Sequence, residues 1–250
     1  MLNDVSCPIC NQASPPLDVV DFNKSCTEHK GDFLRLSGIA VYYYLCRGCG
    51  FCFAPGFSKW SLEEFEKNIY NPQYHQVDPD YESLRPEANA ATLKKILAGK
   101  EEEIRHLDYG GGNGQLSDLL QQAKWDSISW DPFVDKERPV ESLGRFNLIT
   151  AYEVFEHVPD VNALMNNLDM LLSQDGIILF TTMISDGSIL ADKRLTWWYA
   201  SPRNGHISLF TRKSLGLLAE TFNFRFGSFS NAFHVCSRQH VPAWASHLMK

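Results

Sequence analysis

The chain has 250 residues, of which 44% are hydrophobic and 21% are charged, proportions that are typical of a globular protein and exclude a disordered or fibrous one. The formal net charge of -7 is spread along the sequence without a basic block, so we expect no nucleic-acid partner. The sequence has no apolar run of about 18 residues and does not open with a signal-peptide pattern. We therefore expect no membrane span and a cytoplasmic location.

Residues 1–57 carry six of the seven cysteines and a β-rich run, VYYYLCRGCGFCF. Four of these cysteines form two C-x-x-C pairs, Cys7 with Cys10 and Cys46 with Cys49. In a reducing compartment such pairs indicate a metal before disulfides, and a closed set of four thiolates is what structural zinc prefers. The segment is predicted to be a small zinc-ribbon-like module.

The residue directly after each pair, Asn11 or Gly50, suits the left-handed backbone that follows a cysteine knuckle. Buried free thiols and a redox pair are the alternatives to zinc, although neither pair has the strand-and-helix setting of a redox motif. Cys26, Cys52 and Cys236 are interpreted as small buried apolar side chains.

Residues 58–103 are predicted to form a helical connector. SLEEFEKNIYN begins with a Ser N-cap followed by glutamates in its first turn, and EANAATLKKILAGKEEE is a strong helix former that ends near Gly99. A polar loop between the two helices carries Tyr70, Tyr74 and Tyr81.

Residues 104–250 alternate short apolar strands with helical segments, the pattern of a parallel sheet covered by helices. The predicted strands are 104–109, 127–131, 146–152 and 176–182. The predicted helices are 114–124, 160–173 and 211–221. NFRFGSF and NAFHVCS are predicted to close the sheet as a hairpin, so the fold class is α/β.

A glycine-rich turn lies between the first of these strands and the first helix. An acid at the strand end, Asp108, is followed by Gly110, Gly112 and Gly114. Such a bare turn lets backbone N–H groups approach a polar or anionic ligand at the carboxyl end of the sheet. A dinucleotide fingerprint would need a third glycine or an alanine where the sequence has Gln115, so the fit to that motif is poor.

The acid, the glycine turn and the next strand end together resemble the first motif of the class I S-adenosylmethionine-dependent methyltransferases. FNLITAYEVFEHVPD resembles the fourth strand and following turn of the small-molecule branch, with Asn147 where the family usually has Asp. GIILFTTM and GHISLFTRKSLGLLAETFNF resemble later parts of the same core. The resemblance covers roughly residues 104–230 and implies a Rossmann-like sheet with helices on both faces.

The resemblance also implies the cofactor contacts. Asp108 and the loop glycines would hold the methionine end of S-adenosylmethionine, and Asp131 the two ribose hydroxyls. Only fourteen residues separate Asp131 from Phe146, too few for the usual third strand and its adenine-contacting acid. Phe133 is hypothesised to stack on the adenine instead, and Tyr74 and Glu153 complete the predicted cofactor set. The resemblance also implies that the connector, residues 58–103, covers the cofactor.

Two cysteine pairs followed by a tyrosine-bearing segment resemble what precedes the core in sugar C-methyltransferases and their relatives. This second resemblance implies that the zinc is structural. It also implies a small polar acceptor, with a sugar or nucleotide-sugar as the leading hypothesis.

Methyl transfer is an in-line displacement that needs a base when the acceptor is protonated. Candidates are Glu156 and His157 after the fourth strand, and Tyr199 and His206 in WWYASPRNGHISLF. The alternative is structural: His157 would cap the next helix, and His206 would make a local hydrogen bond beneath aromatics covering the sheet edge. In the functional interpretation these aromatics form a lid, and Arg203 binds phosphate or carboxylate.

Two rival functions remain open at this level. An NAD-dependent oxidoreductase would use the same glycine loop, and a non-catalytic module would only sense the cofactor. The N/D-P-P-Y turn of many nucleic-acid methyltransferases is replaced here by YEVFEH, which again disfavours nucleic acid. The sequence carries no signal for the oligomeric state.

Overall fold

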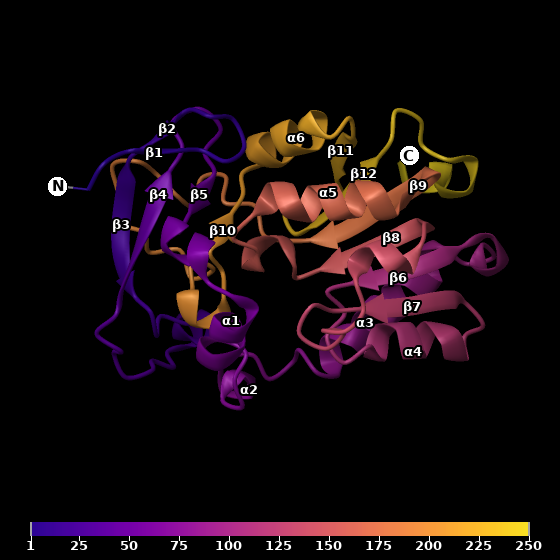
Figure 1. Ribbon diagram of the computed structural model, residues 1–250, viewed down its shortest axis with the longest axis horizontal. Helices are drawn as coiled ribbons and strands as arrows, with labels where there is room; N and C mark the ends of the chain where they lie inside the picture. Colours follow the sequence, from indigo (N-terminus) through magenta and orange to yellow (C-terminus); the bar gives the residue numbers. More distant parts are fainter. Residues whose placement is uncertain (1, 250) are drawn as a thin grey trace. The chain divides into compact units, whose positions relative to one another are not determined.

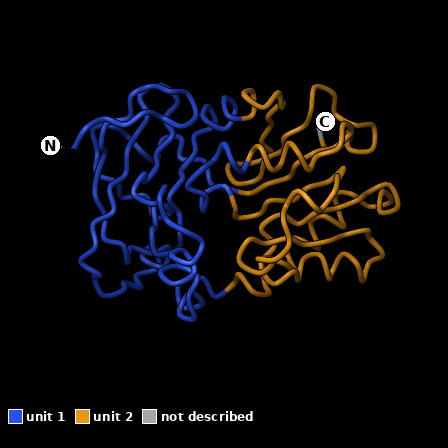
Figure 2. Tube along the Cα trace, viewed as in Figure 1, with its two compact units in different colours: residues 1–79, 155–164, 182–218 blue, residues 80–154, 165–181, 219–250 orange. Residues whose placement is uncertain are grey.

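The computed structural model of the protein describes residues 2–249, which group into two units (Figure 2). The first unit contains residues 1–79, 155–164 and 182–218, and the second contains residues 80–154, 165–181 and 219–250. Helices α5 (Val161–Leu171) and α6 (Arg212–Thr221) each have residues in both units.

The second unit is built on a six-stranded sheet with the order β11-β12-β9-β8-β6-β7 (Figure 1). Strands β6 (Arg105–Tyr109), β7 (Asp126–Trp130), β8 (Phe146–Tyr152) and β9 (Leu172–Thr181) run parallel to one another. The closing hairpin of β11 (Arg225–Ser228) and β12 (Phe233–Ser237) joins β9 in the antiparallel direction. The predicted α/β class is confirmed, with a mixed sheet.

Helices lie on both faces of this sheet. The ring of His106 contacts Trp125, which follows α4 (Gln115–Gln122), with 6.4 Å between ring centroids. Tyr109 lies three residues further along β6 and pairs through its hydroxyl with Asn167 of α5 at 3.0 Å. Because successive side chains of a strand point to opposite faces, α4 and α5 cover opposite sides.

The core of the second unit fills the α4 face. Helix α3 (Leu84–Ile96) packs against α4, and Leu93, Leu120 and Leu148 are fully buried in this cluster. Burying each such side chain contributes roughly 1.5–3 kcal/mol.

Strand β7 is an edge of the sheet. Within residues 2–249 no strand lies between β7 and β8, and the connection holds only a short 3₁₀ turn at Val140–Leu143. The structure therefore agrees with the expectation that this segment is too short for a third strand.

The first unit contains two small antiparallel sheets. Strands β1 (Val5–Ser6) and β2 (Ala13–Ser14) pair with each other. The second sheet has the order β10-β5-β4-β3, with bounds Ser208–Leu209, Cys52–Phe53, Ala40–Leu45 and Pro16–Asp21. The unit also contains α1 (Leu62–Asn68) and α2 (Tyr74–Val77).

Helix α1 begins at the predicted serine cap. The Ser61 hydroxyl accepts a hydrogen bond from Glu64 N–H at 3.2 Å, and the Glu64 carboxylate accepts one from Ser61 N–H at 2.7 Å. This reciprocal capping box satisfies two backbone donors that the first turn would otherwise leave unpaired.

The two units divide the chain differently from the three predicted segments 1–57, 58–103 and 104–250. Residues 182–218 belong with the N-terminal part because β10 pairs with β5, with Ser208 opposite Phe53. The N–H of Ala54 extends this pairing by donating to the Ile207 carbonyl at 2.9 Å. Strands of two residues, paired across more than 150 positions, leave no periodicity for sequence analysis to detect.

Across residues 2–249, none of the helices is both long enough and apolar enough to pass through a bilayer.

Candidate functional site

The glycine turn after β6 has the backbone that its sequence requires. Gly110, Gly112 and Gly114 have φ values of +74°, +55° and +82°, and Gly114 is the N-cap of α4. Side-chain-bearing residues rarely adopt this left-handed region. The turn therefore depends on glycine at all three positions.

Neighbouring side chains also leave no room for a Cβ atom at two positions of this turn. A Cβ built on Gly110 would lie 2.6 Å from Val154 Cγ2. One built on Gly111 would lie 2.5 Å from Asp108 Oδ2 and would also overlap Ser129 Oγ. Within the described part of the chain this Ser129 hydroxyl is buried without a hydrogen-bond partner. The loop thus lies directly on the side chains at the ends of β6 and β7.

Asp108 is buried beneath this turn. Its carboxylate accepts a hydrogen bond from the Thr150 hydroxyl at 2.7 Å. Burial raises the pKa of Asp108 to about 7; the hydrogen bond from Thr150 lowers the pKa and the charge of Asp131 raises it. A cationic ligand group placed against this carboxylate would favour its ionised form.

Asp131 follows β7 and is fixed by two backbone donors. Its carboxylate oxygens accept hydrogen bonds from Gly112 N–H at 3.1 Å and Phe133 N–H at 2.8 Å. Burial nonetheless raises the pKa of Asp131. Each carboxylate oxygen has two lone pairs, so both can still accept hydrogen bonds from neighbouring hydroxyls of a ligand. The side chains present therefore fit a ligand with one cationic end and vicinal hydroxyls.

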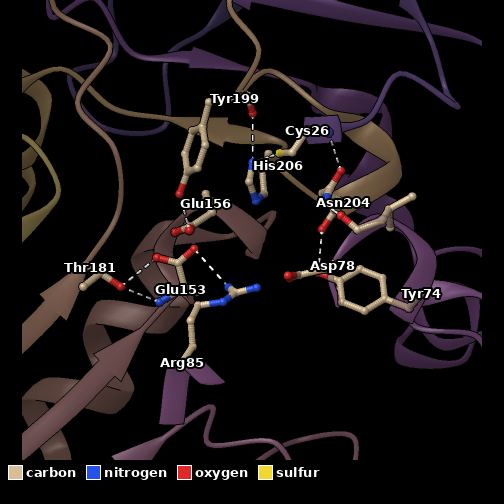
Figure 3. Close-up of polar contacts among 11 residues, drawn as sticks. Cys26, Tyr74, Asp78, Arg85, Glu153, Glu156, Thr181, Tyr199, Asn204 and His206 are labelled. Atoms are coloured by element: carbon tan, nitrogen blue, oxygen red, sulfur yellow. Dashed lines mark hydrogen bonds and ion pairs between the residues drawn. The ribbon is translucent and has the colours of Figure 1, made fainter. Parts of the chain in front are cut away.

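Glu153 lies in the turn after β8 with φ of +54°, an uncommon value for a residue with a side chain. Its backbone N–H and its carboxylate both bond the Thr181 hydroxyl, at 2.8 and 2.9 Å, and its other oxygen lies 3.4 Å from Arg85 (Figure 3). Backbone strain of this kind costs about 1–3 kcal/mol and is characteristic of functional sites. Neither Arg85 nor Thr181 was among the residues predicted from the sequence.

The four predicted catalytic residues lie together in the first unit. The Tyr199 hydroxyl donates a hydrogen bond to the fully buried Glu156 carboxylate (Figure 3). The His206 ring lies 4.1 Å from the Tyr199 ring and 4.9 Å from the His157 ring, measured between centroids. Ligating atoms of Glu156, His157 and His206 are all within 4.8 Å of one another.

Hydrogen bonding fixes the tautomer of His206. Its Nδ1 lies 2.9 Å from the Tyr199 carbonyl oxygen, which can only accept, so Nδ1 carries the proton. The other ring nitrogen, Nε2, is then the basic one in the neutral ring. A Cβ on Gly205, which has φ of +88°, would lie 2.8 Å from His157 Nδ1, so glycine here allows the close approach of His157.

The remaining predicted contacts have structural partners. The Tyr74 hydroxyl lies 3.3 Å from both Asp78 Oδ2 and the Asn204 carbonyl within the first unit (Figure 3). Arg203, considered as an anion-binding fork, is buried and donates to the Ile69 carbonyl at 2.9 Å. Its guanidinium therefore stabilises the segment after α1, within the first unit.

The four paired cysteines form one cluster. The sulfurs of Cys7 and Cys49 are 3.7 Å apart and those of Cys10 and Cys46 are 3.3 Å apart. Four thiolates around zinc at about 2.3 Å would lie roughly 3.8 Å from one another, so the donor set and spacing fit this ion. Asn11 and Gly50 have φ values of +58° and +76°, as expected after each knuckle.

Other parts of the first unit support the two knuckles. Thr211 donates to the Cys49 carbonyl at 2.6 Å and Lys213 to the Gly48 carbonyl at 2.7 Å. The Asn162 amide donates to the Pro8 carbonyl at 2.8 Å. The cysteine cluster is thus tied to later segments of the chain.

Comparison with known proteins gives related sequences and folds. The chain is 26% identical to the ubiquinone biosynthesis O-methyltransferase of Bordetella avium (strain 197N) over 110 residues, covering 35% of this chain and 46% of that protein. For the enzyme of the same name from Histophilus somni (strain 2336), identity is 25% over 159 residues, covering 49% and 62%. The chain thus spans less than two thirds of these relatives.

Among solved structures, an O-methyltransferase family protein from Burkholderia thailandensis has a TM-score of 0.50 at 11% identity, covering 74% of this chain and 64% of that one. This likeness shows the fold, and it agrees with the predicted Rossmann-like architecture. The sequence profile described as "Methyltransferase domain" matches residues 81–227. That match spans more than half of the sequence and confirms the resemblance seen in the motifs, so the chain belongs to the methyltransferase-domain family.

Proposed function

We propose that the protein is an S-adenosylmethionine-dependent methyltransferase that acts on a small polar acceptor. Family membership supports methyl transfer over hydride transfer. The observation that carries the proposal is the pair of buried carboxylates, Asp108 and Asp131, at a turn with three left-handed glycines. When bound, the cofactor supplies a methyl group on a positively charged sulfur.

Each part of the proposed cofactor site has a distinct task. Asp108 binds the α-ammonium group at the methionine end, and Asp131 accepts hydrogen bonds from the ribose hydroxyls. The Phe133 ring stacks on the adenine, replacing the acid that a third strand would supply. Glu153 and Tyr74 remain proposed cofactor contacts.

The acid–base groups that we propose are the residues predicted from the sequence, Glu156, His157, Tyr199 and His206. Transfer of the methyl group to a protonated acceptor would release the acceptor's proton, which a base of this chain would take up. His206 suits this step because the carbonyl of Tyr199 fixes a proton on Nδ1, so that Nε2 is the basic nitrogen of the neutral ring. His157 is the alternative base, and Glu156, which accepts a hydrogen bond from Tyr199, is the proposed acidic partner within 4.8 Å of both histidines.

The acceptor we propose is a sugar or nucleotide-sugar, from the resemblance of the cysteine module to that of sugar C-methyltransferases. The names of the curated relatives specify methylation of oxygen, so ring hydroxyls should be tested together with carbon acceptors. We also propose that the four-cysteine cluster holds one structural zinc, supported by its sulfur spacing and knuckle backbone.

The test is a turnover assay in which release of S-adenosylhomocysteine is followed with a panel of sugars and nucleotide-sugars. Methyl transfer to one of them, greatly reduced in His206→Ala, would support the proposal. Nicotinamide-dependent oxidation or reduction of the same compounds, without release of S-adenosylhomocysteine, would favour the oxidoreductase alternative. Cofactor binding without turnover of any acceptor would favour a sensing module.

A further inference from the structure

A chain of buried polar side chains crosses three strands of the second unit and ends at Asp108. Ser127 Oγ lies 2.7 Å from His106 Nδ1, and His106 Nε2 lies 2.9 Å from Thr150 Oγ1. Thr150 Oγ1 in turn lies 2.7 Å from Asp108 Oδ1. All four residues are buried, with His106 and Thr150 fully inaccessible.

With Asp108 ionised, this series of hydrogen bonds has one consistent direction. The single proton of the Thr150 hydroxyl goes to the carboxylate, which can only accept when ionised. Towards His106 the same oxygen must therefore accept, so Nε2 of the imidazole carries the proton. Nδ1 is then unprotonated and accepts from the Ser127 hydroxyl. Burial lowers the pKa of His106 to about 3, which agrees with a neutral ring that donates on one side and accepts on the other.

Strand register explains why these side chains meet. β6 lies between β7 and β8, with His106 opposite Ser127 and Asp108 opposite Thr150. Residues two apart on a strand share a face, so His106 and Asp108 both point to the α4 side of the sheet.

We propose that Thr150 and His106 are positioning residues, which hold Asp108 ionised and in a fixed orientation for the cationic methionine end of the cofactor. The inference rests on the proposed function for the identity of that ligand. Every hydrogen bond in the chain points towards the carboxylate, and each donor polarises the next. The array is therefore matched to the ionised carboxylate.

Another group facing Asp108 acts in the opposite sense, because Asp131, after β7, repels the ionised carboxylate as a like charge. Burial raises the pKa of Tyr152, on β8, so its phenol is neutral and adds no charge. Burial disfavours the ionised carboxylate as well. The Thr150 hydroxyl is the hydrogen-bond donor that opposes these effects, and His106 holds that hydroxyl in place.

The consequence is a defined pH dependence of cofactor affinity. Binding of an ammonium group requires ionised Asp108, so affinity falls as the pH drops below the pKa of this carboxyl in the free protein, about 7. Removing the Thr150 hydroxyl raises that pKa. The acid limb of the pH profile, which is the pH range where affinity falls on acidification, then moves to higher pH. An alkaline limb near pH 8, where the α-amino group of the cofactor loses its proton, stays in place.

The experiment is calorimetric titration with S-adenosylmethionine from about pH 5.5 to about pH 9. It compares the unmodified protein, Thr150→Val and Thr150→Ser, with 5′-methylthioadenosine as a second ligand that lacks the amino-acid end. In Thr150→Val the acid limb should move up by about one pH unit, so that affinity at pH 6.5 falls about tenfold. Thr150→Ser should retain the original limb, and affinity for methylthioadenosine should change in neither variant.

An unchanged acid limb in Thr150→Val, or an equal change for methylthioadenosine, would overturn the inference. No binding by the unmodified protein would instead overturn the proposed function, and the inference is then tested without cofactor. Nuclear magnetic resonance should show His106 neutral and protonated on Nε2, and the Asp108 carboxyl titrating at higher pH in Thr150→Val. If this variant does not fold, two His106 variants replace it. His106→Gln keeps a hydrogen-bond donor near the Nε2 position and should leave the acid limb of the affinity profile unchanged, whereas His106→Leu should shift it to higher pH.

Discussion

Gly111 in the glycine turn after β6 is predicted to resist replacement for a reason different from that of Gly112. It is not among the glycines with positive φ, so its backbone would tolerate alanine. Its Cβ, however, would lie 2.5 Å from Asp108 Oδ2 and would also overlap Ser129 Oγ. Gly112 has the opposite constraint, with φ of +55° and nothing within 4 Å of a built Cβ.

The magnitudes follow from these two constraints. Gly111→Ala must displace the Asp108 carboxylate and the Ser129 hydroxyl on adjacent strands, and overpacking of this kind costs about 1–3 kcal/mol. Because one displaced group is the Asp108 carboxylate, cofactor affinity should also fall, by about tenfold or more for a shift worth 1.4 kcal/mol. Gly112→Ala should cost about 1–2 kcal/mol in stability through backbone strain alone.

Denaturant unfolding and calorimetric titration of both variants measure the two effects. Ser129→Ala provides a further control, because it removes one of the two overlapped atoms and should recover part of the stability lost in Gly111→Ala. A double-mutant cycle would give this coupling directly. A Gly111→Ala protein that binds the cofactor as tightly as the unmodified protein, with no coupling to Ser129→Ala, would refute the reasoning.

Three further outcomes are expected. His206→Ala should lower turnover by about 100-fold or more while cofactor affinity stays within about threefold, and equal losses in both would mean that His206 only supports the fold. Asp108→Asn should change the pH dependence of stability: the folded pKa of about 7 exceeds the unfolded value of about 3.9, so the unmodified protein loses stability as pH rises from about 4 to about 7. Unfolding across this range should show a stability gain for Asp108→Asn that is largest above pH 7 and absent near pH 4, and a constant difference would contradict the shifted pKa. Cys7→Ser should reduce bound zinc from about one per chain to near zero and lower the unfolding temperature, whereas Cys236→Ser, on a strand outside the cluster, should keep its metal in elemental analysis.

The second unit was largely predictable because its elements carry their own periodic patterns. Strand β8 matches the predicted 146–152, and β6 and β7 differ from their predicted bounds by one residue at their ends. Strand β9 begins at Leu172, four residues earlier than predicted, because Ser173 and Asp175 lack the apolar character by which a buried strand is identified.

The polar layer beneath the glycine loop was not predicted, although the sequence contains a signal for it. His106 and Asp108, like Ser127 and Ser129, occupy alternate positions of strands otherwise identified by their apolar residues. Polar side chains at a period of two inside buried strands indicate a hydrogen-bonded layer. Which residues pair across strands depends on register, which the sequence does not specify.

The grouping of the candidate catalytic residues in the first unit could not be predicted from the sequence. Glu156, His157, Tyr199 and His206 were identified as candidates from two separate motifs. Their assembly into one cluster depends on the long-range pairing of β10 with β5 and on the Ile207 N–H donating to the Glu156 carbonyl at 2.9 Å. Neither contact has a local sequence signature.

The most direct test of the central claim is to measure cofactor binding by calorimetry, with the full chain and with variants of it. S-adenosylmethionine would be titrated into the unmodified protein, Asp131→Ala and Asp126→Ala, the last removing an exposed carboxylate at the opposite end of the same strand. Binding by the unmodified protein and Asp126→Ala, weakened at least tenfold in Asp131→Ala, is the predicted result. Equal binding by all three proteins, or binding of NADH in place of S-adenosylmethionine, would contradict the assignment of this loop as the cofactor site.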